Sequence, residues 1–87
     1  MRNIVFETIS AFEQFNQISE NRKIHAKIIE LINDIQRHPF NGIGKPEPLK
    51  YDLTGFWARR ISQEHRLVYK ITEEEIIIVS CKFHYQE

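Results

Sequence analysis

Residues 56–85, FWARRISQEHRLVYKITEEEIIIVSCKFHY, hold the strongest strand signals of this 87-residue chain. The stretch divides into three segments rich in β-branched and aromatic side chains, which favour extended structure, and polar breaks separate the segments. The sequence therefore predicts an antiparallel meander, with one more strand before a turn at Thr54-Gly55. The predicted strands are residues 49–53, 56–62, 66–71 and 76–85.

The chain ahead of this meander predicts one short strand and two helices. Asn3–Phe6 is an apolar run, and apolar side chains then recur at helical spacing over residues 8–19 and 21–37. Pro39 ends the second helix because proline disfavours helical geometry in the residue before it. We expect an α+β fold, with the two N-terminal helices packed on one face of an antiparallel sheet of four to five strands, in a single domain spanning residues 1–87.

Alternation of side chains along the last two strands predicts which face carries polar groups. Arg66, Lys82 and His84 should converge on the face away from the helices. That register needs a three-residue loop, Glu73–Glu75, between the strands, because like faces must stay together. The residues expected on the core face are Leu67, Tyr69, Ile71, Ile77, Val79, Cys81 and Phe83.

The segment PFNGIGKPEP, residues 39–48, holds all three prolines and two of the three glycines. It can neither continue a helix nor lie inside a sheet, so it predicts a loop ordered by rigidity more than by contacts. Loops of this length in compact domains are often functional. Gly42 and Gly44 do not form a phosphate-binding P-loop, because the serine or threonine after Lys45 is missing and Pro46 blocks the helix that would follow.

The overall composition limits the kinds of partner and compartment. Twelve basic and twelve acidic side chains cancel, so the chain lacks the strongly basic signature of many nucleic-acid binders and any RNA site must be local. The single cysteine, Cys81, cannot form an internal disulfide and fits a buried role in a reducing compartment. The N-terminal residues show neither a signal peptide nor a membrane span, so we expect a soluble, cytoplasmic protein.

Residues 44–71, GKPEPLKYDLTGFWARRISQEHRLVYKI, and the terminal KFHY at 82–85 resemble the signature of YoeB-type toxins of the RelE superfamily. With the preceding strand and helices, the resemblance covers nearly the whole chain. It implies a RelE-like microbial ribonuclease fold, cleavage of messenger RNA on the ribosome, and neutralisation by a YefM-like antitoxin. It also points to a homodimer and to repression of the toxin's own operon, with operator DNA reached only through the antitoxin complex.

The resemblance assigns four catalytic residues: Glu47 as general base, Arg66 as phosphate stabiliser, His84 as general acid and Tyr85 as the residue that positions a base. It assigns three supporting RNA-binding or phosphate-binding positions: Lys50, Arg60 and Lys82. The family ends in a stretch resembling Arg-Tyr-His-Tyr, whereas Lys82 and Phe83 precede His84 here. A lysine keeps the charge of the arginine but loses its fork of donors. No metal or other cofactor is expected.

These residue types also suit the chemistry when considered without the family. RNA carries its own nucleophile, the 2′-hydroxyl, so cleavage needs a base, an acid and a group that stabilises charge on the phosphate. A carboxylate, a histidine and a guanidinium can supply these functions, and an aromatic ring can stack on an unpaired base. Each residue alone has a simpler interpretation: Glu47 as a solvated loop acid, Arg66 as an ion-pair partner of Glu64, and His84 and Tyr85 as a frayed terminus.

Two other functions stay open at the level of sequence. The chain could inhibit a protein target such as a topoisomerase without cutting RNA, since one fold can host unrelated functions. It could also act as a binding module in a repressor complex, which would be an added role. The combination of Glu47, Arg66 and His84 argues for the nuclease. The aromatic residues expected in the core are Phe56, Trp57 and Tyr69.

Overall fold

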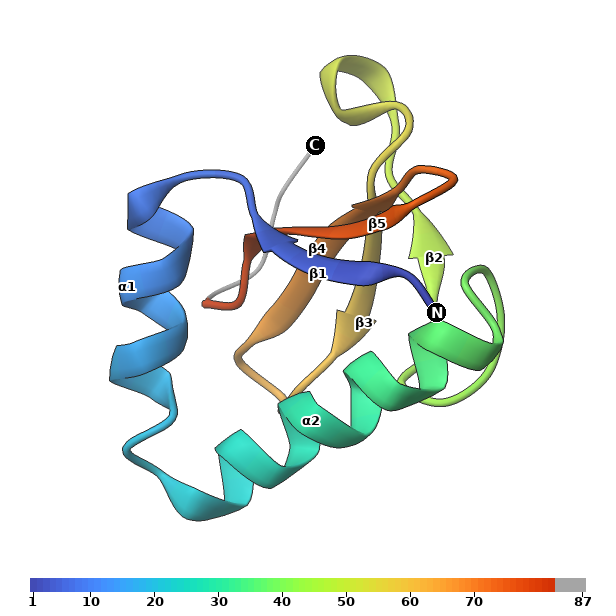
Figure 1. Ribbon diagram of the computed structural model, residues 1–87. Coiled ribbons are helices and arrows are strands. Elements are labelled where there is room, and N and C mark those ends of the chain that lie inside the picture. The colour runs from blue at the N-terminus through green and yellow to red at the C-terminus, as the bar shows by residue number, and fades with distance from the viewer. Residues whose placement is uncertain (83–87) are drawn as a thin grey trace.

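A computed structural model describes residues 1–82 of the chain (Figure 1). The two helices and the strands β1, β3 and β4 lie within two residues of the predicted boundaries. The elements in this part of the chain are β1 (Asn3–Phe6), α1 (Ile9–Ile18), α2 (Arg22–Arg37), β2 (Glu47–Pro48), the 3-10 helix η1 (Tyr51–Leu53), β3 (Trp57–Arg60), β4 (Arg66–Ile71) and β5 (Glu75–Ser80).

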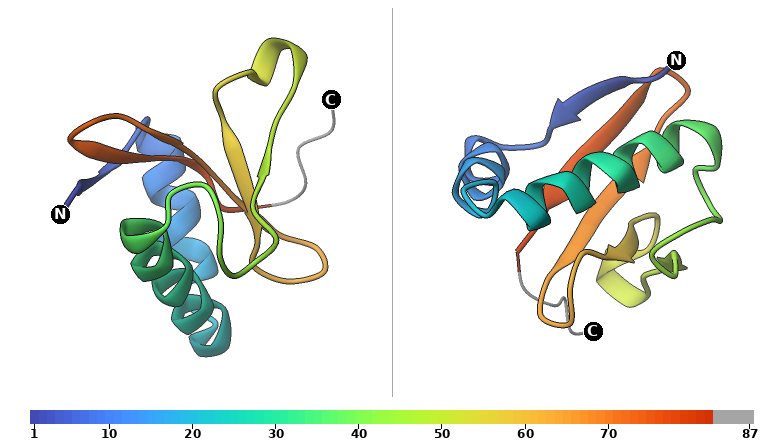
Figure 2. Two further views of the ribbon diagram at one scale, coloured as in Figure 1. Left: turned by 90° about the vertical axis from the view of Figure 1, so that its right-hand side faces the viewer. Right: turned by 90° about the horizontal axis from the view of Figure 1, so that it is seen from below.

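Both helices cover the same face of the sheet (Figure 2). The side chains of Thr8 and Asn21 accept hydrogen bonds from backbone N–H groups of the first turns of α1 and α2, so each helix begins at a capping residue. The apolar stripe of α2 is fully buried at Ile28, Leu31 and Ile35 against the sheet. Burial of each such side chain contributes about 1.5 to 3 kcal/mol. The expected α+β fold is confirmed.

The sheet has the strand order β1-β5-β4-β3-β2 and is mixed. The pairs β5-β4, β4-β3 and β3-β2 are antiparallel, as expected, but β1 runs parallel to β5. A parallel neighbour requires a long connection, and the two helices are part of the chain that joins β1 to the rest of the sheet. Neither helix in residues 1–82 is long and apolar enough to cross a membrane.

The register between β4 and β5 differs from the prediction. Thr72 N donates to Glu75 O at 2.9 Å, so the loop is the two residues Glu73 and Glu74, and the predicted three-residue loop is wrong. An irregularity between Val68 and Tyr69 then shifts the register by one residue. The hairpin can therefore use a tight loop while the strand beyond the shift returns to the predicted alignment, with Val68 opposite Ser80.

The prediction of which β5 side chains face the core is therefore wrong as well. Ile76 and Ile78 are buried with α1 and α2, whereas Val79 packs on the opposite face of the sheet. Directly opposite residues of an antiparallel pair share a face, so the pairing of Tyr69 with Ile78 fixes this orientation. Cys81 is buried in the helix-facing core, as expected, while Phe83 lies outside the described residues.

A second, smaller apolar cluster lies on the face away from the helices, and it explains why residues 49–53 do not form the predicted strand. Leu49, Leu53 and Phe56 pack onto Ala58 and Val68 of the sheet. The chain turns through η1, where Tyr51 adopts a positive φ of 57°, and this turn brings the apolar side chains on either side of it onto the sheet. The strand that pairs with β3 is instead the two residues just before, β2.

Candidate functional site

A buried arginine of β3 binds both α2 and the loop that leads from α2 to β2. The side chain of Arg59 is fully buried, and its Nη1 donates to Asp34 Oδ2 of α2 at 2.6 Å. Its Nε donates to the hydroxyl of Tyr69 at 3.0 Å, and that hydroxyl donates in turn to the carbonyl of Pro39 at 2.9 Å. The Arg59 hydrogen bond lowers the pKa of the Asp34 carboxyl, and the Ile43 backbone N–H lowers it further.

The same guanidinium holds the segment between α2 and β2. Arg59 donates to three backbone carbonyls: His38 at 2.5 Å, Asn41 at 2.7 Å and Ile43 at 3.0 Å. The expectation that rigidity would order this loop more than contacts is therefore wrong. The sequence predicted no role for Arg59. The basic residues expected to act were Arg60, next to it in β3, and Arg66 in β4.

The end of this loop is fixed against both layers of the fold. Gly44 has a φ of +78°, and a β-carbon at that position would lie 2.6 Å from Leu31 Cδ2 of α2. The Gly44 carbonyl accepts a hydrogen bond from Arg60 N at 2.7 Å. The following residue, Lys45, has a φ of +50°. Glu47 then pairs with Ala58 of β3, so its side chain shares the face of Ala58, away from the helices.

On that face the structure forms a pocket of about 310 Å³. Its lining brings together three of the basic residues and one carboxylate, from the loop end, β2, β3 and β4. Arg60 and Arg66 are directly paired across β3 and β4, which places their side chains on one face. The pocket is lined by Lys45, Glu47, Ala58, Arg60 and Arg66.

Arg66 is oriented by the turn between β3 and β4. Its Nη1 donates to the carbonyl of Ser62 at 2.7 Å and to that of His65 at 3.0 Å. Burial lowers the pKa of the Arg66 guanidinium, the neighbouring charge of Arg60 lowers it further, and the carboxylate of Glu47 raises it. Arg66 therefore sits in the electric field of both Arg60 and Glu47, and it stays charged at neutral pH because an arginine pKa starts so high.

The predicted site residues are not all brought to this pocket. Glu47, Arg60 and Arg66 line it, whereas Lys50 and Lys82 do not. Lys50 directly precedes η1, and its carbonyl accepts from Leu53 N at 3.0 Å. The expected convergence of Lys82 with Arg66 is not found, since the Lys82 ammonium donates to Gln17 Oε1 of α1 at 2.9 Å. The other two predicted catalytic residues, His84 and Tyr85, lie outside the described residues.

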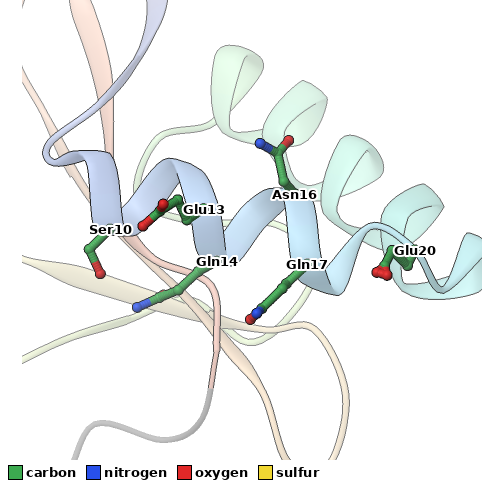
Figure 3. A pocket seen from close by; sticks show the side chains of 6 residues that line it. All are labelled: Ser10, Glu13, Gln14, Asn16, Gln17 and Glu20. Carbon is green, nitrogen blue, oxygen red and sulfur yellow. The ribbon is translucent and has the colours of Figure 1, made fainter.

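A larger hollow of about 550 Å³ lies along α1, and Figure 3 shows the side chains that line it. All of its lining side chains come from this helix and the turn after it, and they are polar. Gln14 uses its side-chain oxygen to accept from Ser80 Oγ at 3.0 Å and from the Cys81 backbone N–H at 3.2 Å. Gln14 therefore anchors the end of β5, and the hollow that it lines does not bring together groups suited to catalysis. It is lined by Ser10, Glu13, Gln14, Asn16, Gln17 and Glu20.

The three expected aromatic assignments and the expected cysteine assignment are confirmed as structural. Tyr69 is fully buried, and Phe56 packs on the cluster of the outer face. Trp57 packs against the helix-facing core and lies 5.0 Å from Phe40, centroid to centroid. Burial raises the pKa of the Cys81 thiol to about 11, so at neutral pH it is protonated and a poor nucleophile.

The chain is similar to known proteins both in sequence and in fold. Residues 7–85 match the family model for the YoeB-like toxin of the bacterial type II toxin-antitoxin system. The chain is 55% identical over 65 residues to the toxin YoeB of Escherichia coli K12, which covers 75% of this chain and 77% of that toxin. The YoeB/ParE toxin from Agrobacterium tumefaciens has a TM-score of 0.90 at 39% identity, covering 95% of this chain and 99% of the other.

YoeB from Staphylococcus aureus has been solved in two assemblies, and in both the YoeB chain resembles this one. In the YoeB-YefM complex the match has a TM-score of 0.88 at 47% identity, covering 98% of this chain and 99% of the other. In the YoeB dimer it has a TM-score of 0.88 at 48% identity, covering 97% and 98%. The similar proteins thus span nearly the whole chain, including the loop, β2 and the strands that form the pocket.

Proposed function

The chain belongs to the YoeB-like toxins of bacterial type II toxin-antitoxin systems, and from this we propose that it is a ribosome-dependent endoribonuclease that cleaves messenger RNA in the ribosomal A site. The single observation that carries this proposal is the pocket that joins Glu47 to Arg60 and Arg66. A carboxylate beside two guanidinium groups is a set that can accept a proton and hold a phosphate at the same place.

The proposed reaction is an attack by the substrate's own 2′-hydroxyl. Glu47 takes the proton of that hydroxyl as the new bond from O2′ to phosphorus forms. The bond from phosphorus to O5′ breaks, and His84 gives a proton to the departing oxygen. The products are a 2′,3′-cyclic phosphate on the upstream fragment and a 5′-hydroxyl on the downstream fragment, and Tyr85 positions a base by stacking.

Arg66 suits the stabilising role in this reaction. Its hydrogen bonds within residues 1–82 come from Nη1, so Nε and Nη2 keep donors for the non-bridging phosphate oxygens. Because the turn carbonyls already fix the guanidinium, little reorganisation is needed when charge develops on the phosphate. Three cations and one carboxylate form a set that binds anions, and the proposed mechanism uses no metal ion at the enzyme site.

We propose further that a YefM-like antitoxin neutralises the toxin in the cytoplasm, since the S. aureus relative was solved with YefM. Lys50, Arg60 and Lys82 would bind RNA phosphates, and the basic pocket would also attract acidic groups of the antitoxin. Operator DNA would be bound through the antitoxin complex. A homodimer is proposed by analogy with the S. aureus YoeB dimer.

The test is single-turnover cleavage of messenger RNA on isolated programmed ribosomes, in the magnesium that ribosomes need. Glu47→Gln and His84→Gln should each lower the rate of cleavage by about 100- to 10,000-fold while leaving ribosome binding nearly unchanged. Replacing the 2′-hydroxyl of the scissile nucleotide with hydrogen should abolish cleavage. Normal cutting of that substrate would refute the internal nucleophile, and normal rates in both variants would refute the assigned base and acid.

A further inference from the structure

Lys45 lines the pocket with Glu47, Arg60 and Arg66, although neither the sequence pattern nor the family resemblance predicted a role for it. It is the residue just before the proline that leads into β2, and its side chain is exposed. Within residues 1–82 the Lys45 ammonium takes part in no hydrogen bond or ion pair. A charged group therefore reaches the pocket without a structural partner among these residues.

The backbone at Lys45 favours a different residue type. Its φ of +50° lies in the left-handed region, where a β-carbon is unfavourable and glycine or asparagine is preferred. The following residue, Pro46, restricts this position further. The conformation persists because the preceding residue is held on both sides, by the hydrogen bond from Arg60 N to the Gly44 carbonyl and by the close approach of Gly44 to Leu31. The backbone conformation therefore does not explain why a long cationic side chain stands at this position.

We propose that Lys45 is an RNA-binding residue whose ammonium contacts the phosphate next to the scissile one on the same strand. The inference rests on the proposed function and adds a second phosphate position to it. Lys45 and Glu47 are two residues apart, at most about 7 Å of chain, and the lysine stem extends its reach beyond the phosphate held by Arg66. An ammonium on a flexible stem serves as a point charge for a phosphate, which suits holding the strand more than stabilising a transition state.

The charge balance of the pocket supports two phosphates over one. Three cations and one carboxylate leave two positive charges in excess, and each phosphodiester of RNA carries one negative charge. A single scissile phosphate would leave one of the cations uncompensated in the complex. A neighbouring phosphate would complete the balance, and Lys45 is the one cation lining this pocket to which the proposed function assigns no role, since Arg66 has the stabilising role and Arg60 is assigned to RNA phosphate.

The decisive variant is Lys45→Asn, because asparagine tolerates a positive φ while it removes the charge. Lys45→Arg keeps the charge, and Lys23→Asn removes one positive charge from α2 at an exposed position outside the pocket. Each protein is measured in three ways: its melting temperature, its kcat and KM for cleavage on programmed ribosomes, and its binding to a short single-stranded RNA with a 2′-deoxy scissile nucleotide across a range of salt.

Lys45→Asn should melt at the same temperature or higher, yet raise KM by about 10-fold with kcat nearly unchanged, because a contact made equally before and during the chemical step affects binding alone. The slope of log affinity against log salt should fall by about 0.7, which corresponds to one phosphate contact on a single strand. Lys45→Arg should restore KM and the slope, and Lys23→Asn should alter neither.

Two results would overturn the inference. Unchanged RNA affinity and salt slope in Lys45→Asn would make Lys45 a residue of the loop alone. A loss in kcat with an unchanged KM would place it in the chemical step. The binding measurement separates this inference from the proposed function: RNA binding that depends on Lys45, in a protein that does not cleave, would refute the nuclease proposal and retain the phosphate contact.

Discussion

Arg59 and Arg60 are neighbours in β3 with opposite roles. Arg60 reaches the pocket, while Arg59 turns inward and meets a carboxylate, a phenol hydroxyl and three carbonyl oxygens. A buried charge is tolerated when it is paired and hydrogen-bonded, and removal of its partner costs about 3 to 5 kcal/mol. Asp34 is that partner, so one carboxylate of α2 determines whether the Arg59 network can exist.

This pairing predicts a dependence of stability on acid. The pKa of Asp34 is lowered in the fold by its hydrogen bond to Arg59. Its stabilising contribution is therefore complete above the unfolded pKa near 4 and is lost as the pH falls through the lower folded pKa. Urea unfolding from pH 7 to pH 3 should show a free energy of unfolding that declines at the acid end.

In Asp34→Asn the protein should lose about 3 kcal/mol at pH 7, and less of the remaining stability should disappear in acid. Glu13→Gln, at an exposed carboxylate of α1, should leave the acid profile of the wild type nearly intact. An Asp34→Asn profile parallel to that of the wild type would show that other carboxylates govern acid unfolding.

At the scale of elements, the loop from α2 to β2 depends on Gly44. An alanine there would suffer both the positive φ of +78° and a contact of 2.6 Å with Leu31 Cδ2. Gly55 offers a matched control, because it also has a positive φ, of +98°, but nothing lies within 4 Å of its added β-carbon. Gly55→Ala should cost about 1 kcal/mol from backbone strain alone.

Gly44→Ala should cost about 2 to 4 kcal/mol, since the crowded contact adds to the strain. It should also lower cleavage, because the Gly44 carbonyl and Arg60 N fix the loop end that carries Glu47. Denaturant unfolding and the cleavage assay together test this expectation. Equal losses of stability in the two glycine variants would mean that the loop can shift away from Leu31 without cost.

The elements also show how far the sequence could lead. Helical periodicity predicted α1 and α2 well, and the resemblance identified three residues that do line one pocket: Glu47, Arg60 and Arg66. The faces of β5 could not be obtained this way, because Ile76 to Val79 are all apolar and their orientation follows from a tight loop and a register shift. The role of Arg59 depends on contacts with residues distant in sequence, and no local pattern distinguishes it from Arg60.

At the scale of the whole molecule, α1 and the end of β5 are joined by a polar contact across more than sixty residues of sequence. Gln14 accepts from the Ser80 hydroxyl and from the buried Cys81 N–H, and Gln17 accepts from the exposed end of Lys82. Figure 3 shows both glutamines pointing from α1 on the same side. The two contacts differ mainly in burial.

Gln14→Met keeps a side chain of similar length but removes the acceptor of a buried N–H, so it should lower the free energy of unfolding by about 1 to 3 kcal/mol. Gln17→Met removes a contact at an exposed charge and should cost less than about 1 kcal/mol. Because the segment after Cys81 carries the proposed acid, Gln14→Met should slow cleavage as well. Similar stabilities for the two variants would remove the anchoring role from Gln14.

The parallel pairing of β1 with β5 determines how late in synthesis the sheet can form. β1 pairs with β5, which follows it by more than seventy residues. β5 must also pair with β4 before β1 is joined to the other strands of the sheet. Contacts between such distant segments form late in folding. A nascent chain that has not yet extended past Ser80 lacks the strand that unites both halves of the sheet, so the five-stranded sheet can be completed only after β5 has been synthesised.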